Sequence, residues 1–118
     1  MMMAFWSQAR KTPAILYGVG IVILSAQSSL PTVSTFSWFD KVAHGIEYFI
    51  FTLLVIYGWK RSPVIWIVFA LAMFAFTDEL HQFFVPGRMA TAWDWLADMV
   101  GISMCAFFWS MIKKYERH

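Results

Sequence analysis

The sequence predicts an all-α integral membrane protein, a four-helix bundle in which four transmembrane helices cross the bilayer. The chain has 118 residues, of which 60% are hydrophobic and only 14% charged, and its mean hydropathy is +0.61. Soluble domains normally carry about 25% charged residues. A chain this short cannot bury so much apolar surface in water. The composition therefore excludes a soluble globule, a disordered tail and a disulfide-rich secreted module, and the single cysteine permits no internal disulfide.

Four apolar stretches follow one another along the chain, at roughly 12–30, 42–59, 63–84 and 94–112. Each has about the 20 residues that a helix needs to cross a hydrocarbon core of about 30 Å. Their apolar residues are continuous rather than alternating, which favours helices over the strands of a barrel. We expect a single domain over residues 1–118.

The first stretch follows a basic pair, and its polar residues, Tyr17 and Ser25 among them, are not ionisable at neutral pH. We interpret it as a helix that mainly packs against the others. The apolar run at 14–24 also resembles a secretory signal, but the residues after it form a poor cleavage site, which favours a retained helix.

Proline and glycine residues indicate where the third stretch begins and ends and where helices can approach closely. Ser-Pro at 62–63 is typical of a helix start, and Val-Pro-Gly at 85–87 is typical of a turn. Glycines in the first and fourth stretches, Gly18, Gly20 and Gly101, permit close approach of neighbouring helices.

The basic residues predict the orientation of the chain. Seven of the nine lie on the side shared by the N-terminus, the second loop and the C-terminus, namely Arg10, Lys11, Lys60, Arg61, Lys113, Lys114 and Arg117. Cytoplasmic segments are enriched in lysine and arginine. We therefore expect both termini to be cytoplasmic and the protein to lie in the plasma or inner membrane.

The acidic residues show the opposite bias. Six of the seven lie near the extracytoplasmic ends of the second, third and fourth stretches, namely Asp40, Glu47, Asp78, Glu79, Asp94 and Asp98. Helical spacing places these acids and some of their neighbours in a stripe along one face of each helix. On the second stretch the face carries Asp40, His44, Glu47 and Tyr48. On the third it carries Asp78, Glu79 and Gln82, whereas His81 points elsewhere, and on the fourth it carries Asp94, Asp98, Gly101 and Cys105. The stripes predict a shared polar pocket beneath the extracytoplasmic surface.

Ionised groups at membrane depth cost a few kcal/mol unless they are paired or solvated. Three solutions fit this pocket: protonated acids, charged histidines or a bound cation. Magnesium or calcium suits oxygen ligands, and zinc, with His44 and Glu47, is the weaker alternative. For a divalent cation we predict Asp78, Asp94 and Asp98 as the ligands.

Three blocks of this pattern resemble the VanZ-like membrane protein family, over residues 38–105. The blocks are Asp40-Lys41-x-x-His44-x-x-Glu47-Tyr48, then Asp78-Glu79-Leu80-His81-Gln82-x-Phe84-x-Pro86-Gly87-Arg88, then Trp93-Asp94-x-x-Ala97-Asp98-x-x-Gly101. The family commonly has asparagine at the position of Asp98. The resemblance implies a small integral membrane protein, linked in some members to teicoplanin resistance, without an agreed mechanism.

The leading hypothesis is a membrane protein that acts on, or binds, an anionic lipid-linked or cell-envelope substrate. For catalysis the candidates are His44, Glu47 and Glu79, which would move a proton or polarise the substrate. For substrate binding the candidates are Lys41, Tyr48, Gln82 and Arg88, of which the arginine would hold the anionic group.

Several alternatives stay open. The pocket also fits a protein that binds a lipid headgroup or a lipoglycopeptide without chemistry, and thirdly a proton-coupled transporter. Arg88 and Asp94 also fit a salt bridge, and Asp94 fits the N-cap of the fourth helix. The bilayer is an expected partner, whereas a net charge of +2 gives no argument for nucleic acid. A monomer and an oligomer both fit.

Overall fold

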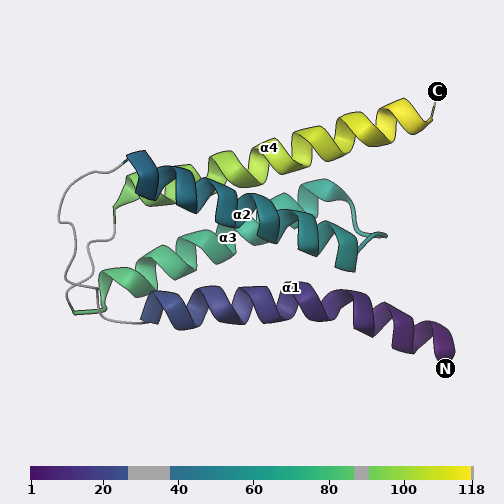
Figure 1. Cartoon of the computed structure of the whole chain (residues 1–118), viewed down its shortest axis with the longest axis horizontal. Coiled ribbons are helices and arrows are strands. Elements are labelled where there is room, and N and C mark those ends of the chain that lie inside the picture. Colours follow the sequence, from purple (N-terminus) through teal and green to yellow (C-terminus); the bar gives the residue numbers. More distant parts are fainter. Residues whose placement is uncertain (27–37, 87–90, 118) are drawn as a thin grey trace.

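The computed structural model describes residues 1–26, 38–86 and 91–117, which form four helices. Their bounds are α1 Met2–Ala26, α2 Trp38–Gly58, α3 Val64–Phe83 and α4 Ala92–Glu116. The helices run up and down, so the two chain ends lie at the same end of the bundle (Figure 1). The described residues contain no strand, and the all-α prediction is confirmed.

Three helices are long and apolar enough to cross a membrane. The stretches are Lys41–Gly58, Val64–Phe83 and Ala92–Glu116. The second, third and fourth predicted stretches are therefore helices that are able, by length and composition, to cross a membrane.

Helix α1 differs from its prediction, because it begins at Met2 rather than near residue 12. Its N-terminal part carries Arg10, Lys11 and Pro13, so its continuous apolar part covers residues 14–26. That is about 20 Å of helix, against a core of about 30 Å. The predicted span continued to residue 30, which lies outside the described residues. A membrane crossing by α1, and with it cytoplasmic termini, stays a prediction.

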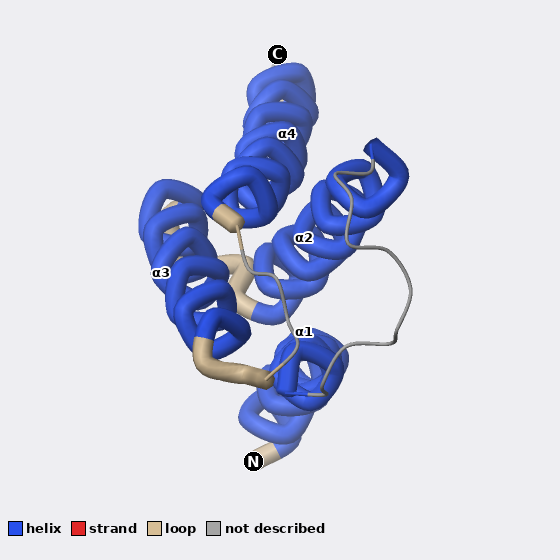
Figure 2. Tube along the Cα trace, turned by 90° about the vertical axis from the view of Figure 1, so that its left-hand side faces the viewer, coloured by secondary structure: helices blue, strands red, loops and turns tan. Residues whose placement is uncertain are grey.

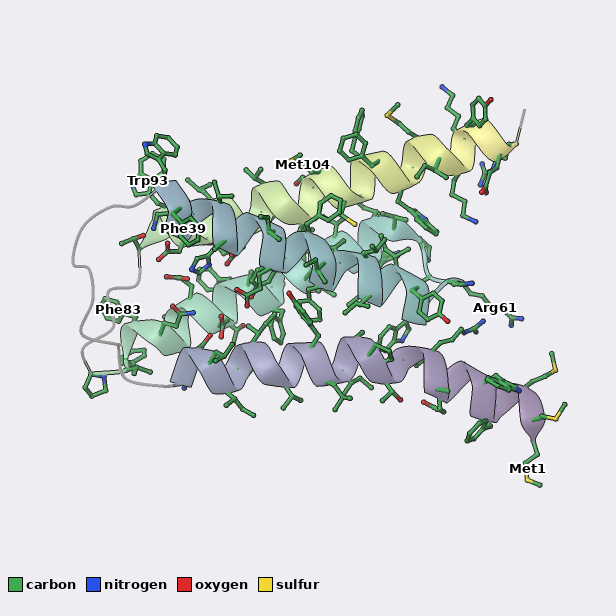
Figure 3. The ribbon with its side chains drawn as sticks, viewed as in Figure 1. Met1, Phe39, Arg61, Phe83, Trp93 and Met104 are labelled. Atoms are coloured by element: carbon green, nitrogen blue, oxygen red, sulfur yellow. The ribbon has the colours of Figure 1, made fainter. Side chains whose placement is uncertain are left out.

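The burial pattern is the inverse of that in a soluble protein. In an apolar window of 18 residues within each of the three stretches, only 28%, 22% and 28% of the residues are buried. Large apolar side chains such as Phe83, Trp93 and Met104 point outward (Figure 3). The buried side chains of the described residues nevertheless include six polar ones: Ser25, Thr52, Asp78, Gln82, Asp94 and Asp98. Lipid around the bundle explains both halves of this pattern.

Figure 2 views the bundle from the end at which α2 and α4 begin, and shows the four helices around a common interior. Helices α2 and α4 touch through their backbones. A Cβ atom on Gly101 would collide with the carbonyl oxygen of Gly45 and lie 3.1 Å from the amide nitrogen of Phe49. The predicted close approach at Gly101 is confirmed, whereas the one at Gly20 is wrong, because nothing lies within 4 Å of a Cβ there.

These two glycines give a matched pair of variants. We expect Gly101→Ala to lower the free energy of unfolding by about 1–3 kcal/mol, since the added methyl group must push α2 and α4 apart. Gly20→Ala should be neutral or slightly stabilising, because alanine favours a helix more than glycine does. Reversible unfolding in mixed detergent micelles measures both. Equal stability of the two variants would contradict the close α2–α4 contact.

Candidate functional site

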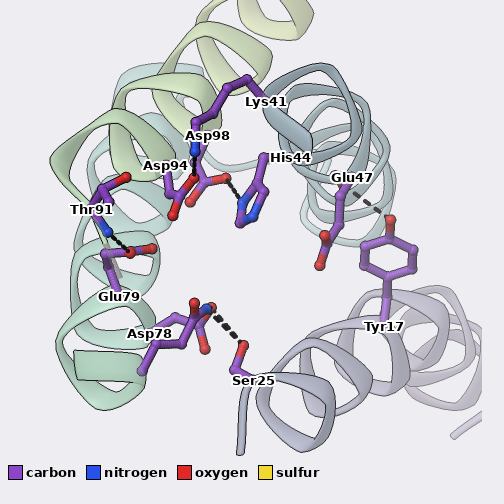
Figure 4. Close-up of polar contacts among 11 residues, drawn as sticks. Tyr17, Ser25, Lys41, His44, Glu47, Asp78, Glu79, Thr91, Asp94 and Asp98 are labelled. Atoms are coloured by element: carbon purple, nitrogen blue, oxygen red, sulfur yellow. Dashed lines mark hydrogen bonds and ion pairs between the residues drawn. The ribbon is translucent and has the colours of Figure 1, made fainter. Parts of the chain in front are cut away.

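Polar side chains from all four helices gather at the end of the bundle opposite the chain termini (Figures 3 and 4). We call this group the polar cluster. Its members are Ser25 from α1, Lys41, His44, Glu47 and Tyr48 from α2, Asp78, Glu79 and Gln82 from α3, and Asp94 and Asp98 from α4.

Two ion-pair contacts join α2 to α4. Nδ1 of His44 lies 3.0 Å from Oδ1 of Asp98, a side chain that is only 1% exposed. The ammonium group of Lys41 donates a hydrogen bond to the buried carboxylate of Asp94. The paired residues are 54 and 53 positions apart in the chain, so one parallel register of α2 and α4 makes both contacts.

Helix α3 is joined to α1 by a buried trio. The hydroxyl of Ser25 donates to Oδ2 of Asp78 over 2.9 Å, and Nε2 of Gln82 donates to the same carboxylate oxygen over 3.0 Å. Nε2 of Gln82 also donates to the oxygen of Ser25 over 3.1 Å. The other oxygen of this carboxylate, Asp78 Oδ1, is buried and has no hydrogen-bond partner among the described residues.

Glu79 contacts the beginning of α4. Its Oε1 accepts a hydrogen bond of 3.0 Å from the backbone amide of Thr91, the N-cap residue of that helix. Its Oε2 is buried without a hydrogen-bond partner in the described part of the chain. One oxygen of Glu79 therefore holds the start of α4, and the other is available as an acceptor.

Tyr48 lies among the carboxylates. Its side chain is 1% exposed, and its hydroxyl has no hydrogen-bond partner within the described ranges. The carboxyl groups of Asp98, Asp78, Glu47 and Glu79 lie within electrostatic range of this hydroxyl. A buried hydroxyl without a partner costs about 1–3 kcal/mol. Tyr48 is thus placed where its polar atom contributes nothing evident to folding.

Acidic side chains outnumber basic ones in the polar cluster. Five carboxylates, on Glu47, Asp78, Glu79, Asp94 and Asp98, lie at this end of the bundle. The cations of the cluster are Lys41 and, when protonated, His44, and each of them contacts a carboxylate. The arrangement therefore offers more hydrogen-bond acceptors than donors, and a molecule that brings donors complements it.

A scan against protein-family models matches the chain to VanZ/LLP1 over residues 2–113. The chain belongs to the VanZ/LLP1 family. The resemblance predicted from three blocks of sequence is confirmed, and the match extends over nearly the whole chain. No curated protein and no solved structure is significantly similar to this VanZ/LLP1 chain.

The structure of this VanZ/LLP1 protein brings most of the predicted site residues to one end. Nine of them belong to the polar cluster: Lys41, His44, Glu47, Tyr48, Asp78, Glu79, Gln82, Asp94 and Asp98. Arg88, the predicted anion-binding residue, lies outside the described residues, and so does the side chain of Asp40. His81 is exposed, as its helical position predicted. Their roles in catalysis or binding stay predictions.

Some interpretations change with the structure. The N-cap of α4 is Thr91, and Asp94 lies within the first turn, so the N-cap alternative for Asp94 is wrong. Helix α1 is more than a packing helix, because Ser25 joins the cluster and the hydroxyl of Tyr17 donates to the backbone oxygen of Glu47 over 3.0 Å. The sequence contained a signal for this contact face of α1. The small or apolar residues Ala14, Gly18, Ile21 and Ser25 follow one another at spacings of four, three and four, which places them on one helix face, and all four are buried.

The carboxylates predicted as metal ligands have different protein partners. Asp78 contacts Ser25 and Gln82, Asp94 contacts Lys41, and Asp98 contacts His44. Among the described residues, no group of three or more His, Cys, Asp or Glu side chains is arranged to hold a metal ion. The divalent-cation site stays a prediction, and no step below uses it.

The VanZ/LLP1 bundle also has two large grooves, and of the polar cluster only Lys41 lines either of them. One, of about 610 Å³, is lined by α1, α2, α3 and the loop residues Trp59 and Ser62, and the other, of about 430 Å³, is lined by α2 and α4. Both are lined mainly by apolar side chains, with Lys41 at the edge of the second. They are thus suited to apolar chains rather than to the polar part of a ligand.

Proposed function

We propose that this VanZ/LLP1 protein binds the glycan head group of an amphipathic, lipid-linked cell-envelope molecule in the polar cluster. The observation that carries the proposal is that, among the described residues, three buried polar atoms of the polar cluster have no hydrogen-bond partner in the protein: Tyr48 Oη, Asp78 Oδ1 and Glu79 Oε2. They combine two carboxylate acceptors with one hydroxyl donor. Sugar hydroxyls both donate and accept hydrogen bonds, so they complement such a mixture.

The surroundings of these atoms support the same ligand class. His44 and Glu47 are partly exposed and can contact a head group at the rim. The helices below have an apolar exterior, so a ligand with an apolar chain shares the depth of the cluster. The anionic part expected of a lipid-linked substrate would contact Lys41 or Arg88. The distribution of basic residues favours an extracytoplasmic position for the cluster.

Tyr48→Phe tests this proposal, because it removes a hydroxyl that makes no described protein hydrogen bond. We expect the free energy of unfolding to equal that of the wild type or to exceed it, by about 3 kcal/mol at most. We expect retention of a glycolipid to fall about tenfold or more. The probe is diglucosyl diacylglycerol in phosphatidylcholine nanodiscs, with diacylglycerol as the headless probe, and native mass spectrometry counts the retained molecules.

A matched control replaces an acid at the opposite end of the bundle. Glu116→Gln changes a residue that pairs with Lys113 over 3.9 Å, and it should leave glycolipid retention unchanged, whereas Glu79→Gln should lower it. Retention of the headless probe equal to that of the glycolipid, or normal retention by both Tyr48→Phe and Glu79→Gln, would overturn the proposal. Competition by teicoplanin would extend the ligand class to lipoglycopeptides.

The contact between His44 and Asp98 favours a second candidate, acid–base chemistry on the same head group. A carboxylate that holds an imidazole in one orientation is the usual support of a histidine base. The expected result is turnover of a lipid-linked phosphate by the purified protein, with a rate about 10²–10⁴-fold lower in His44→Ala. No turnover, or equal rates in the wild type and in Glu79→Gln and His44→Ala, would leave binding as the function.

A further inference from the structure

The larger groove and several basic residues meet at the end of the bundle opposite the polar cluster. At its inner end the groove is lined by Ile23 and Phe74, and at its outer end by Trp59, Ser62 and Trp66. Lys60 and Arg61 directly precede Ser62 in the loop between α2 and α3. Figure 3 shows Arg61 at the same end of the bundle as Met1.

The dimensions of the groove fit one acyl chain. Its lining runs from Ala14 to Ile23 on α1, which is about 14 Å of helix, and from Trp66 to Phe74 on α3, which is about 12 Å. Half of a hydrocarbon core of about 30 Å is about 15 Å. The groove thus has the length of the hydrocarbon part of one leaflet, and it begins at the end that carries the chain termini.

Basic residues of α1 lie near its outer end. Nζ of Lys11 lies 5.4 Å from the ring centroid of Trp59, which lines the groove. Nε of Arg10 is buried and has no acceptor among the described residues. A Cβ atom on Gly58 would lie 3.2 Å from the backbone oxygen of Arg10, so α1 and α2 hold these residues close to the loop.

The charge at this end is not balanced by nearby acids. The acid at the terminal end in the described part of the chain is Glu116, which belongs to α4 and pairs with Lys113. The second groove differs, because the charge of its Lys41 is balanced by Asp94. Charge complementarity therefore selects the first groove for an anionic lipid.

We propose that this groove binds an anionic phospholipid from the leaflet facing the chain termini, with one acyl chain between α1 and α3. Its phosphate contacts Arg10 and Lys11 of α1, near the outer end of the groove, and Arg61 of the adjoining loop. Basic pockets between transmembrane helices are known to hold anionic head groups. A phosphate oxygen also supplies the acceptor for Nε of Arg10. The site is independent of the function proposed for the polar cluster.

Nanodiscs that contain equal amounts of phosphatidylglycerol and phosphatidylcholine with identical chains test the head-group contacts. Native mass spectrometry of the released protein should find phosphatidylglycerol enriched over phosphatidylcholine. Each of Arg10→Gln, Lys11→Gln and Arg61→Gln should lower this preference about fivefold. Arg61 is exposed, so its variant keeps the test valid if Arg10→Gln fails to fold. Lys114→Gln, at the same end but on α4, should leave the preference unchanged.

A bulky side chain in the groove tests the position of the acyl chain. Ala70 is exposed and lines the first groove, whereas Val100 is exposed and lines the second. Ala70→Phe should remove the retained phosphatidylglycerol, and Val100→Phe should not. Three results would each overturn the proposal: no preference in the wild type, an equal loss in Lys114→Gln, or full retention in Ala70→Phe. None of them bears on glycolipid retention by the polar cluster.

Discussion

Replacement of Asp98 by leucine is expected to lower the free energy of unfolding by about 3–5 kcal/mol. The carboxylate is 1% exposed and lies 3.0 Å from Nδ1 of His44, so its loss leaves a half-buried imidazole without this partner. Reversible unfolding in mixed micelles, followed by the fluorescence of the tryptophans, measures the change. Second-site replacement of His44 by leucine should recover much of the loss, because both polar groups are then absent.

Asp98→Asn is the matched control for this prediction. Asparagine keeps an oxygen that accepts a hydrogen bond from the imidazole but removes the charge, so we expect a loss of only about 0.5–1.5 kcal/mol. A loss as large in Asp98→Asn as in Asp98→Leu would mean that charge, rather than the hydrogen bond, joins α2 to α4.

Length and hydropathy were sufficient to predict most of the fold. A helix that crosses lipid must satisfy its backbone hydrogen bonds internally and expose apolar side chains, so its sequence carries a long continuous apolar run. The stretches of α2, α3 and α4 have that form. The start of α1 was mispredicted because Arg10, Lys11 and Pro13 interrupt the apolar pattern without ending the helix.

Helical periodicity predicted which side chains share a face, but not their partners. Asp94, Asp98, Gly101 and Cys105 are all buried, as their common stripe predicted. The residue that each of these side chains contacts on a neighbouring helix depends on how far the two helices are shifted along each other. The sequence pattern of one helix carries no information about that shift. Lys41 therefore looked like a substrate-binding residue, and its contact with Asp94 emerged only from the packing of α2 on α4.

The contact between Lys41 and Asp94 leads to the second prediction of a large loss of stability. We expect Lys41→Met to lower the free energy of unfolding by about 3–5 kcal/mol, because it leaves the carboxylate of Asp94 buried without its cation. Combining it with Asp94→Leu should restore most of the stability, since apolar residues of similar volume often replace a buried ion pair without loss. The same unfolding titration, applied to both single variants and the double variant, gives the coupling free energy.

The double variant also separates two roles for Lys41. If the lysine only clamps α2 to α4, the stable double variant retains diglucosyl diacylglycerol as the wild type does. If Lys41 contacts the ligand, as its sequence pattern predicts, retention falls although the fold is restored. We expect retention to fall. If apolar side chains can replace the Lys41–Asp94 ion pair without loss of stability, folding does not require this pair, and a role in binding explains it better. Wild-type retention in the stable double variant would remove Lys41 from the site.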